Sequence, residues 1–128
     1  MSNTSVIGLG SNIDPEKNIA AARALLKQEF QVLGESRFVQ TAPVGYADQD
    51  DFINGAVHIE TDLALAELSS RLKQLEERLG HQRSAIKHGP RTIDLDVVVF
   101  NGQIIDNDFY ERDFLRDSVL ELIPKLVY

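Results

Sequence analysis

The stretch RTIDLDVVVFNG, residues 91–102, sets out the most regular pattern in the chain. Because side chains alternate between the two faces of a strand, it predicts a strand over 93–100. One face would carry the apolar side chains of Ile93, Leu95, Val97 and Val99, while Asp94 and Asp96 would share the other face with Val98 and Phe100. The Asn101-Gly102 pair predicts a tight hairpin turn, with a return strand at 103–105.

A helix is predicted immediately upstream. Asp62 is a candidate N-cap and Gly80 a terminator. Between them, leucines recur at the three- and four-residue spacing of one helical face; they are Leu65, Leu68, Leu72, Leu75 and Leu79. Two heptads are too few to favour a coiled coil over packing against a core.

The first half of the chain supplies the remaining elements. Strands are predicted at 5–9, 31–40 and 52–60, and a helix that starts at Pro15 is predicted over 15–29. Residues 42–51 form a loop by composition, and the tail is expected to be a loop with a short helix near 114–123. The order strand, helix, strand, strand, helix, strand predicts an α+β fold. We expect a ferredoxin-like antiparallel sheet with helices on one face, followed by the hairpin strand and the short C-terminal helix.

Composition narrows the functional classes. The 128 residues predict one domain over 1–128, and a net charge of −7 argues against a basic nucleic-acid-binding surface. The absence of cysteine excludes disulfides, thiolate metal sites and a thiol nucleophile. The longest apolar run, Val97–Phe100, is far too short to span a membrane, and the first residues do not resemble a signal peptide. We therefore expect a cytoplasmic protein.

Asp94 and Asp96 are the leading candidates for chemistry. On one face of a strand their Cα atoms lie roughly 6–7 Å apart. Hard oxygen ligands at this spacing suit Mg²⁺, which takes one or two carboxylates together with water and phosphate. A solvent-facing strand surface is the alternative, although Val98 and Phe100 make the same face partly apolar.

The segment before these aspartates is basic. Residues 80–91 hold Arg83, Lys87 and Arg91 with two histidines, His81 and His88, and no acidic residue. Positive groups beside a metal-binding carboxylate pair would complement a polyphosphate. Two alternatives stay open, namely a solvated loop without a role and a zinc site made by the histidines with the aspartates.

Several common signatures are absent. The chain has no Gly-x-x-x-x-Gly-Lys-[Ser/Thr] phosphate loop and no Gly-x-Ser-x-Gly elbow. Residues 8–13 follow a predicted strand but lack the third glycine of the dinucleotide-binding fingerprint.

Four segments together resemble the 6-hydroxymethyl-7,8-dihydropterin pyrophosphokinase family of folate biosynthesis. They are IGLGSN at 7–12, TAPVG at 41–45 leading into DFINGAV at 51–57, GPRTIDLD at 89–96, and 114–126 with its LELIP at 120–124. The third segment is the most specific. The resemblance implies a ferredoxin-like core and Mg²⁺-dependent transfer of the two terminal phosphates of ATP to the pterin hydroxymethyl group, with release of AMP.

The resemblance also implies roles for individual residues. Asp94 and Asp96 match the aspartates that hold two Mg²⁺ ions, and Arg83 and Arg91 match catalytic arginines that grip the phosphates. Further contacts to the nucleotide are implied for three residues, Glu76, Val97 and Arg112.

For the pterin, Phe52 and Phe114 match an aromatic pair that sandwiches the ring, and Asn54 matches a side chain that hydrogen-bonds it. Thr41, Pro43 and Val44 match a loop that contacts the pterin edge. These roles agree with the physics, because flat heteroaromatic rings stack on aromatic side chains and an amide can read an amide-like ring edge.

Some positions depart from the family pattern. His81, His88 and Phe52 replace an arginine, an aromatic residue and a tyrosine respectively, Asp117-Ser118 replaces an apolar-proline pair, and the segment 105–114 is shorter and lacks a Pro-His pair. An alternative is therefore a relative that binds a pterin without turnover or acts on an altered substrate. A third interpretation is a small acidic interaction module. We expect a monomer that acts on small molecules, with neither nucleic acid nor membrane as a partner.

Overall fold

The structure is a computed structural model that describes residues 2–45, 48–80 and 92–128. In this part of the chain a six-stranded antiparallel sheet has the order β2-β4-β1-β5-β6, and β3 pairs with the first residues of β4. The strands are β1 (Asn3–Ser11), β2 (Gln31–Glu35), β3 (Val39–Thr41), β4 (Phe52–Thr61), β5 (Asp94–Phe100) and β6 (Gln103–Ile104).

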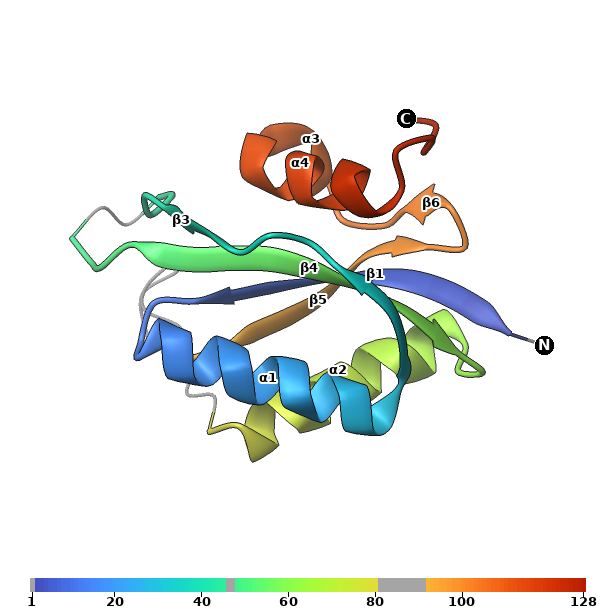
Figure 1. Cartoon of the computed structure of the whole chain (residues 1–128), viewed down its shortest axis with the longest axis horizontal. Helices are drawn as coiled ribbons and strands as arrows, with labels where there is room; N and C mark the ends of the chain where they lie inside the picture. The colour runs from blue at the N-terminus through green and yellow to red at the C-terminus, as the bar shows by residue number, and fades with distance from the viewer. Residues whose placement is uncertain (1, 46–47, 81–91) are drawn as a thin grey trace.

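Helices cover both faces of this sheet (Figure 1). On one face lie α1 (Pro15–Glu29) and α2 (Leu65–Arg78). On the opposite face lie α3 (Asp108–Glu111) and α4 (Asp113–Leu122). The α+β class and the ferredoxin-like order are confirmed. The two helices of the ferredoxin-like order, α1 and α2, lie on one face as expected, and the C-terminal helices α3 and α4 cover a second apolar cluster on the other face.

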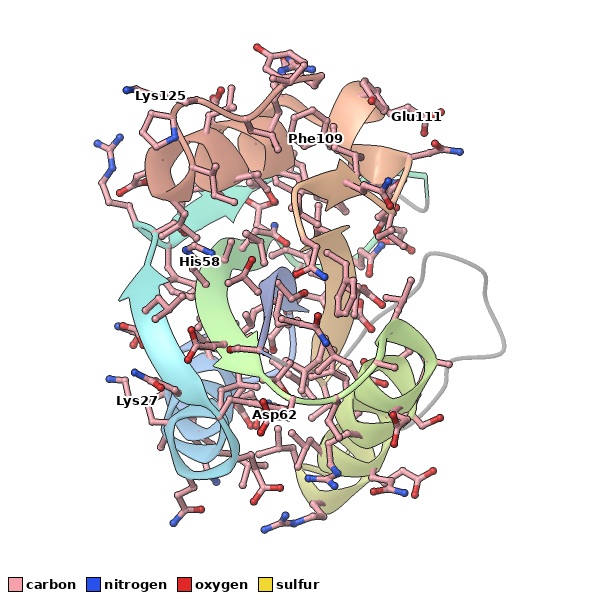
Figure 2. The ribbon with its side chains drawn as sticks, turned by 90° about the vertical axis from the view of Figure 1, so that its right-hand side faces the viewer. Lys27, His58, Asp62, Phe109, Glu111 and Lys125 are labelled. Carbon is pink, nitrogen blue, oxygen red and sulfur yellow. The ribbon has the colours of Figure 1, made fainter. Side chains whose placement is uncertain are left out.

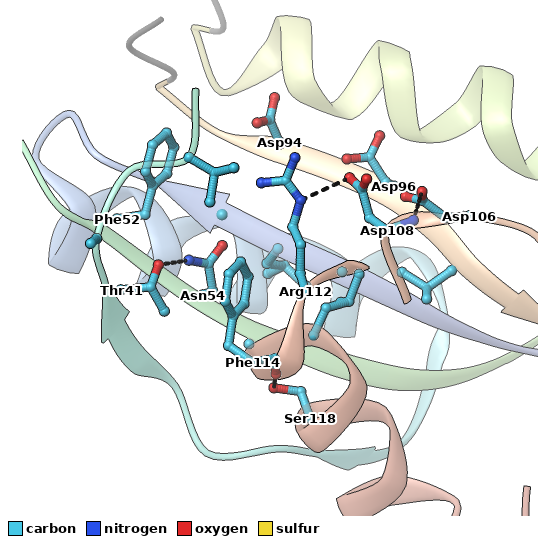
Figure 3. A pocket seen from close by; sticks show the side chains of 18 residues that line it. Thr41, Phe52, Asn54, Asp94, Asp96, Asp106, Asp108, Arg112, Phe114 and Ser118 are labelled. Atoms are coloured by element: carbon cyan, nitrogen blue, oxygen red, sulfur yellow. Dashed lines mark hydrogen bonds and ion pairs between the residues drawn. The ribbon is translucent and has the colours of Figure 1, made fainter. Parts of the chain in front are cut away.

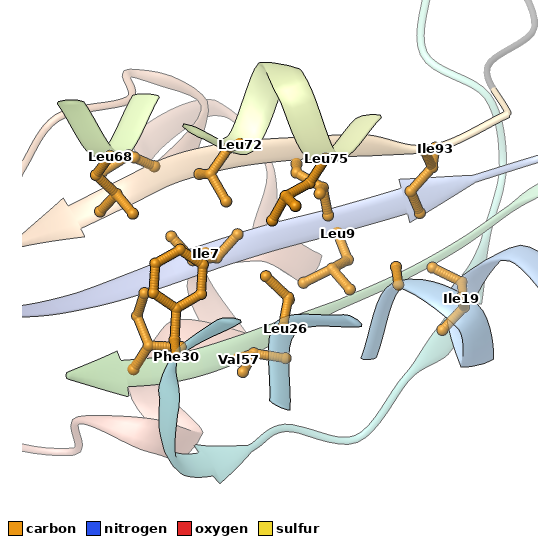
Figure 4. Packing of buried hydrophobic residues seen from close by; sticks show 14 residues of the cluster. Ile7, Leu9, Ile19, Leu26, Phe30, Val57, Leu68, Leu72, Leu75 and Ile93 are labelled. Atoms are coloured by element: carbon orange, nitrogen blue, oxygen red, sulfur yellow. The ribbon is translucent and has the colours of Figure 1, made fainter. Parts of the chain in front are cut away.

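The larger core lies between the sheet and the α1–α2 layer (Figure 4). Ile7 of β1, Leu26 of α1 and Leu72 of α2 are completely or almost completely buried there. Burial of each such side chain contributes about 1.5–3 kcal/mol. The predicted leucine stripe of α2 is the part that faces the sheet, as its helical spacing required.

The alternation predicted for β5 holds only as far as Val97. The pairing of β1 with β5 shifts between Val6 and Ile7, which is the mark of a β-bulge. Beyond it Val98 and Val99 both belong to the second cluster, whereas Phe100 packs against the first. The prediction was therefore wrong for the faces of Val99 and Phe100, because one irregular residue reverses every side chain that follows.

The strand predicted over 31–40 is two strands, β2 and β3, that pair with successive parts of β4. At the break the Ser36 hydroxyl accepts a hydrogen bond from the Ala56 N–H at 2.8 Å, so the ladder stays satisfied. Phe38 then turns onto Gly55, where an added Cβ would stand 2.4 Å from its ring. The guanidinium of Arg23 lies over the same ring, 4.8 Å from its centre.

The predicted start of α2 was wrong, whereas the predicted hairpin turn after β5 is confirmed. Helix α2 is capped at Ala64 and not at Asp62, because the Thr61 hydroxyl accepts the Leu63 N–H and delays the first helical turn. The hairpin turn is confirmed, with φ values of 49° at Asn101 and 80° at Gly102. Both central residues of a type I′ turn need positive φ, which Asn-Gly tolerates.

The short helix α3 was not predicted. Its Phe109 is fully buried and points toward the sheet, whereas Glu111 points to solvent (Figure 2). A single apolar anchor in four residues offers no periodicity from which a helix could be recognised. Within the described ranges, no helix combines the length and the apolar character needed to cross a membrane.

Candidate active site

A cleft of about 230 Å³ lies on the α3–α4 side of the sheet (Figure 3). Its floor is made by β1, β4 and β5, and its walls by the 41–44 loop and by the segment 106–118. Segments from both ends of the chain therefore meet here, as sheet order requires when β1 lies between β4 and β5.

One end of the cleft is aromatic and amide-bearing. Phe52 and Asn54 project from β4 on the same face, and Phe114 projects from the first turn of α4. The Asn54 amide nitrogen donates to the Thr41 hydroxyl at 2.5 Å. Gly10 allows this arrangement, because an added Cβ would lie 2.7 Å from the Asn54 Oδ1. The amide is thus held in one orientation between two aromatic rings in the view of Figure 3.

The other end is acidic. Asp94 and Asp96 point into it from β5, opposite Gly10 and Gly8 of β1, and Asp106 and Asp108 reach it from the segment that follows β6, beside Asp96 in the view of Figure 3. The cleft walls desolvate Asp96, and this raises its pKa to about 6, with Asp94, Asp106 and Asp108 adding to the rise. Asp96 is nonetheless an exposed residue, so the surrounding protein is only a partial barrier to solvent.

This acidic end suits a divalent cation bound together with a substrate. No group of three or more His, Cys, Asp or Glu side chains within the described ranges is arranged to hold a metal ion alone. Mg²⁺, however, is usually held by one or two carboxylates with substrate phosphates and water supplying the other ligands. Asp94 and Asp96 provide that pair, and a bound cation would favour the ionised form of Asp96, whose pKa is raised by desolvation and then by the Asp94 charge.

Arg112 brings positive charge into this acidic region. It is the only cation among the described residues that line the cleft. Its Nε lies 3.5 Å from the Asp108 Oδ2, and its guanidinium extends toward Asp94 (Figure 3). The cleft thus combines a cation with carboxylates next to the aromatic end, an arrangement suited to a phosphate-bearing substrate.

Most of the residues to which the sequence assigned substrate contacts line this cleft. Thr41, Val44, Phe52, Asn54 and Phe114 all do so. Pro43, which lies between two lining residues, is not itself part of the lining.

Two residues assigned to the nucleotide lie elsewhere. Val97 lines a shallower groove between α2 and the 105–107 segment, which it shares with Asp96. Glu76 is 4% exposed, and its Oε2 accepts a hydrogen bond from the Leu95 N–H at 2.7 Å. The structure therefore ties Glu76 to the backbone between the two aspartates, and it is not part of the cleft lining.

The basic residues of the preceding segment lie outside the described residues. These include Arg83 and Arg91, the candidate phosphate ligands, as well as His81, Lys87 and His88. Their predicted roles, and the alternative of a zinc site, stay predictions.

Sequence reasoning missed several cleft residues. Asp106, Asp108 and Ser118 come from the segment that was expected to be a loop and a simple helix. Two aspartates two apart in a polar segment are a common pattern, and only the burial of Phe109 shows that this segment is folded against the sheet.

Comparison with known proteins accords with this geometry. A sequence model of the 7,8-dihydro-6-hydroxymethylpterin-pyrophosphokinase (HPPK) family matches residues 6–124. The chain is 40% identical over 137 residues to 2-amino-4-hydroxy-6-hydroxymethyldihydropteridine pyrophosphokinase of Bacillus subtilis, covering 98% of this chain and 81% of that protein. The protein of the same name from Haemophilus influenzae is 31% identical over 135 residues, covering 97% and 84%.

A plant relative is matched over a smaller part of its length. The mitochondrial folate synthesis bifunctional protein of Arabidopsis thaliana is 34% identical over 132 residues, covering 95% of this chain but 24% of that protein. The family match and the two bacterial relatives extend over nearly the whole sequence. The chain therefore belongs to the 7,8-dihydro-6-hydroxymethylpterin-pyrophosphokinase family.

Proposed function

We propose that this protein transfers diphosphate from ATP to the hydroxymethyl group of 6-hydroxymethyl-7,8-dihydropterin in folate biosynthesis, releasing AMP. The observation that carries the proposal is one cleft in which an aromatic and amide-bearing end adjoins an acidic end that holds Arg112. A flat ring with a short alcohol side chain fits the first end, and a metal-bound polyphosphate suits the second. Family membership supports the same reaction.

The aromatic end would bind the pterin. Phe52 and Phe114 offer ring faces on two different elements, and offset stacking on such rings contributes about 0.5–1.5 kcal/mol beyond burial. The Asn54 Oδ1 is available as an acceptor for ring N–H groups, since its amide nitrogen already donates to Thr41. Orientation of the ring by Asn54 would point the hydroxymethyl group toward the acidic end.

The reaction itself is a displacement at phosphorus. The hydroxymethyl oxygen forms a bond to the β-phosphorus of ATP, and the bond from that phosphorus to the α,β-bridging oxygen breaks. AMP leaves with the bridging oxygen, and the hydroxyl proton passes to solvent or to a cleft base. Alignment of the two substrates is the main contribution that the protein makes to such a reaction.

Asp94 and Asp96 would hold Mg²⁺, for which the family precedent is two ions. Bound Mg²⁺ would neutralise phosphate charge and hold the attacking and leaving oxygens in line. Arg112 would contact the phosphates from the α4 side of the cleft, and Arg83 and Arg91 are proposed to do so from the preceding segment. A cytoplasmic location, a monomeric state and a single domain over 1–128 stay predictions.

The shortened segment 105–114 was the reason to consider a relative without turnover. In the structure this segment forms α3 and leads Arg112 and Phe114 into the cleft. The positions that matter to both substrates are therefore retained despite the missing residues, which favours an active enzyme over the alternative.

Release of AMP from ATP tests the proposal. With Mg²⁺ and 6-hydroxymethyl-7,8-dihydropterin, the protein should form AMP only when the pterin is present. Asp96→Ala should remove this activity, whereas Asp113→Ala, on the exposed side of α4, should leave it intact. Pterin-independent AMP formation, or full activity in Asp96→Ala, would contradict the assignment.

A further inference from the structure

Arg112 occupies an unusual position at the junction of two helices. It follows α3 and precedes α4, with an extended backbone at φ −124° and ψ 108°. Its backbone N–H donates to the Asp108 carbonyl at 2.9 Å, so the turn between the helices is closed on Asp108. The side chain leaves this corner and enters the cleft toward the aspartates of β5 (Figure 3).

Four carboxylates line the cleft together with the Arg112 guanidinium. They are Asp94, Asp96, Asp106 and Asp108. A guanidinium binds carboxylates bidentately wherever its geometry allows. The orientation of the Arg112 guanidinium among these carboxylates therefore decides which of its N–H groups are directed into the cleft.

The position of Asp108 beside Arg112 is fixed by its neighbours. The Asp108 backbone N–H donates to the Asp106 Oδ1 at 2.9 Å, and the neighbouring Phe109 is fully buried in the second core cluster. The residue is therefore fixed on both sides. Its Oδ2 lies 3.5 Å from the Arg112 Nε, and a dashed line marks this ion pair in Figure 3.

This pair leaves one donor unused. The Arg112 Nε is buried and has no hydrogen-bond partner among the described residues, so the 3.5 Å contact is an ion pair and not a hydrogen bond. A buried N–H without an acceptor is costly, so the contact with Asp108 alone does not satisfy the hydrogen-bonding capacity of this guanidinium. Asp108 thus orients the guanidinium without saturating it.

We propose that Asp108 is a positioning residue that acts through Arg112. Its carboxylate holds the guanidinium of Arg112 in the orientation that presents it to a phosphate of the bound nucleotide. The inference rests on the proposed function for the identity of that nucleotide. The pair itself is partly exposed, and such pairs contribute little to fold stability. Its effect should therefore appear in ligand binding.

A double-mutant cycle tests the coupling. The variants are Asp108→Asn, Arg112→Gln and the two combined, titrated calorimetrically with α,β-methylene-ATP in the presence of Mg²⁺. Asp108→Asn alone should weaken binding by about tenfold, which corresponds to about 1.4 kcal/mol. In the Arg112→Gln background the same change should have no further effect, because the residue through which it acts is absent. An equal loss in both backgrounds would overturn the proposal, since it would show a general effect of charge.

Asp113→Asn is the matched control. Asp113 forms the neighbouring ion pair of α4, with Arg116, but lies outside the cleft lining. Its removal should leave nucleotide affinity unchanged. Asp108→Glu, which keeps the charge, should recover part of the affinity that Asp108→Asn loses. Loss of affinity in Asp113→Asn equal to that in Asp108→Asn would count against a specific role.

A measurement on the free protein separates this inference from the proposed function. The Nε–H group of Arg112 should be ordered on the ps–ns timescale by NMR relaxation in the wild type and in Asp113→Asn, and disordered in Asp108→Asn. Unchanged order in Asp108→Asn overturns the positioning role even if the wild type forms AMP. Conversely, loss of order in Asp108→Asn together with no AMP from the wild type would support the positioning role and refute the proposed reaction.

Discussion

The orientation of the Asn54 side chain depends on two neighbouring residues, Thr41 and Gly10. Its amide nitrogen uses the Thr41 hydroxyl, and its oxygen occupies space that exists because residue 10 is glycine. Three segments that are distant in the sequence therefore cooperate to orient one amide. An oriented amide distinguishes between ligand edges because a buried donor or acceptor left unpaired costs about 1–3 kcal/mol.

Asn54→Ala should accordingly weaken pterin binding by about one to two orders of magnitude, which corresponds to about 1.4–2.7 kcal/mol. The affinity for the nucleotide should change little, since the acidic end is untouched. Equilibrium binding of 6-hydroxymethyl-7,8-dihydropterin measures the first effect. Gln40→Ala is the control, because Gln40 lies on the neighbouring strand, pairs with Asp51 and does not line the cleft. Equal losses in the two variants would remove the assignment.

The raised pKa of Asp96 predicts a pH dependence of the free protein. Desolvation and the Asp94 charge raise this pKa from 3.8 to about 6. Between pH 3.8 and pH 6, Asp96 therefore stays protonated in the folded protein but is ionised in the unfolded chain. Stability should therefore fall as pH rises through this window, and Asp96→Asn should raise the melting temperature at pH 7 more than at pH 4.

Carboxyl NMR titration of the metal-free protein checks the same shift directly. The Asp96 midpoint should lie near 6, and it should move down in Asp106→Asn because the Asp106 charge contributes to the rise. A midpoint at the ordinary value, or no response to Asp106→Asn, would show that the cleft does not perturb this group.

The face of the sheet on which the site residues of β4 and β5 lie could be predicted from the sequence. Strict alternation placed Phe52 and Asn54 on one face, and Asp94 with Asp96 on the face that β1 leaves open through Gly8 and Gly10. Glu76 was different. Its spacing of four from Leu72 and three from Leu79 places it beside the leucine stripe, but the bond that it accepts from the Leu95 N–H depends on how closely α2 approaches β5.

At the scale of elements, the break between β2 and β3 positions the loop that carries Thr41. Phe38 fills the space over Gly55, and Arg23 of α1 packs over the same ring. This stack fixes the direction in which β3 leaves the sheet edge, and with it the hydroxyl that orients Asn54.

Gly55→Ala should disturb that stack. A methyl group 2.4 Å from the Phe38 ring must displace it, and overpacking of this kind costs about 1–3 kcal/mol. Denaturant unfolding should show the loss, and pterin affinity should fall with it as β3 shifts. Gly34→Ala is the matched change in the adjacent strand, where the added Cβ would stand at 3.4 Å from Leu122, an ordinary contact. Similar stability of the two variants would contradict this account of the loop.

Element boundaries were predictable where local chemistry decides them. Pro15 marks the start of α1, and Asn101-Gly102 marks the hairpin. The bulge in β5 was not predictable, because its neighbours are all valines and either face accepts them. Helix α3 was missed for a related reason, since its formation depends on Phe109 finding a pocket on the far side of the sheet.

At the scale of the molecule, the two faces of the sheet have different roles, one in stability and the other in forming the cleft. The face under α1 and α2 carries the larger core, and the opposite face carries both the smaller core and the cleft. The sheet can therefore hold the site rigidly, because its other side is filled by close-packed leucine and isoleucine side chains (Figure 4).

Leu72→Ala should show how much that core contributes. Leu72 is 1% exposed, and truncation of such a leucine costs about 2–5 kcal/mol of unfolding free energy. Leu33→Ala, at a leucine that is 45% exposed on β2, should cost far less. Chemical denaturation of both variants gives the comparison, and equal losses would indicate that the α2 interface is not the main core.

The most direct test of the central claim follows the label of ATP into product. With ATP labelled at the β-phosphate, Mg²⁺ and 6-hydroxymethyl-7,8-dihydropterin, we expect a labelled pterin diphosphate to form in equal amount with AMP. The Asp94→Ala/Asp96→Ala double variant should form neither. Label that stays in ADP or appears in free pyrophosphate, with the pterin unchanged, would contradict the claim that this cleft joins the two substrates.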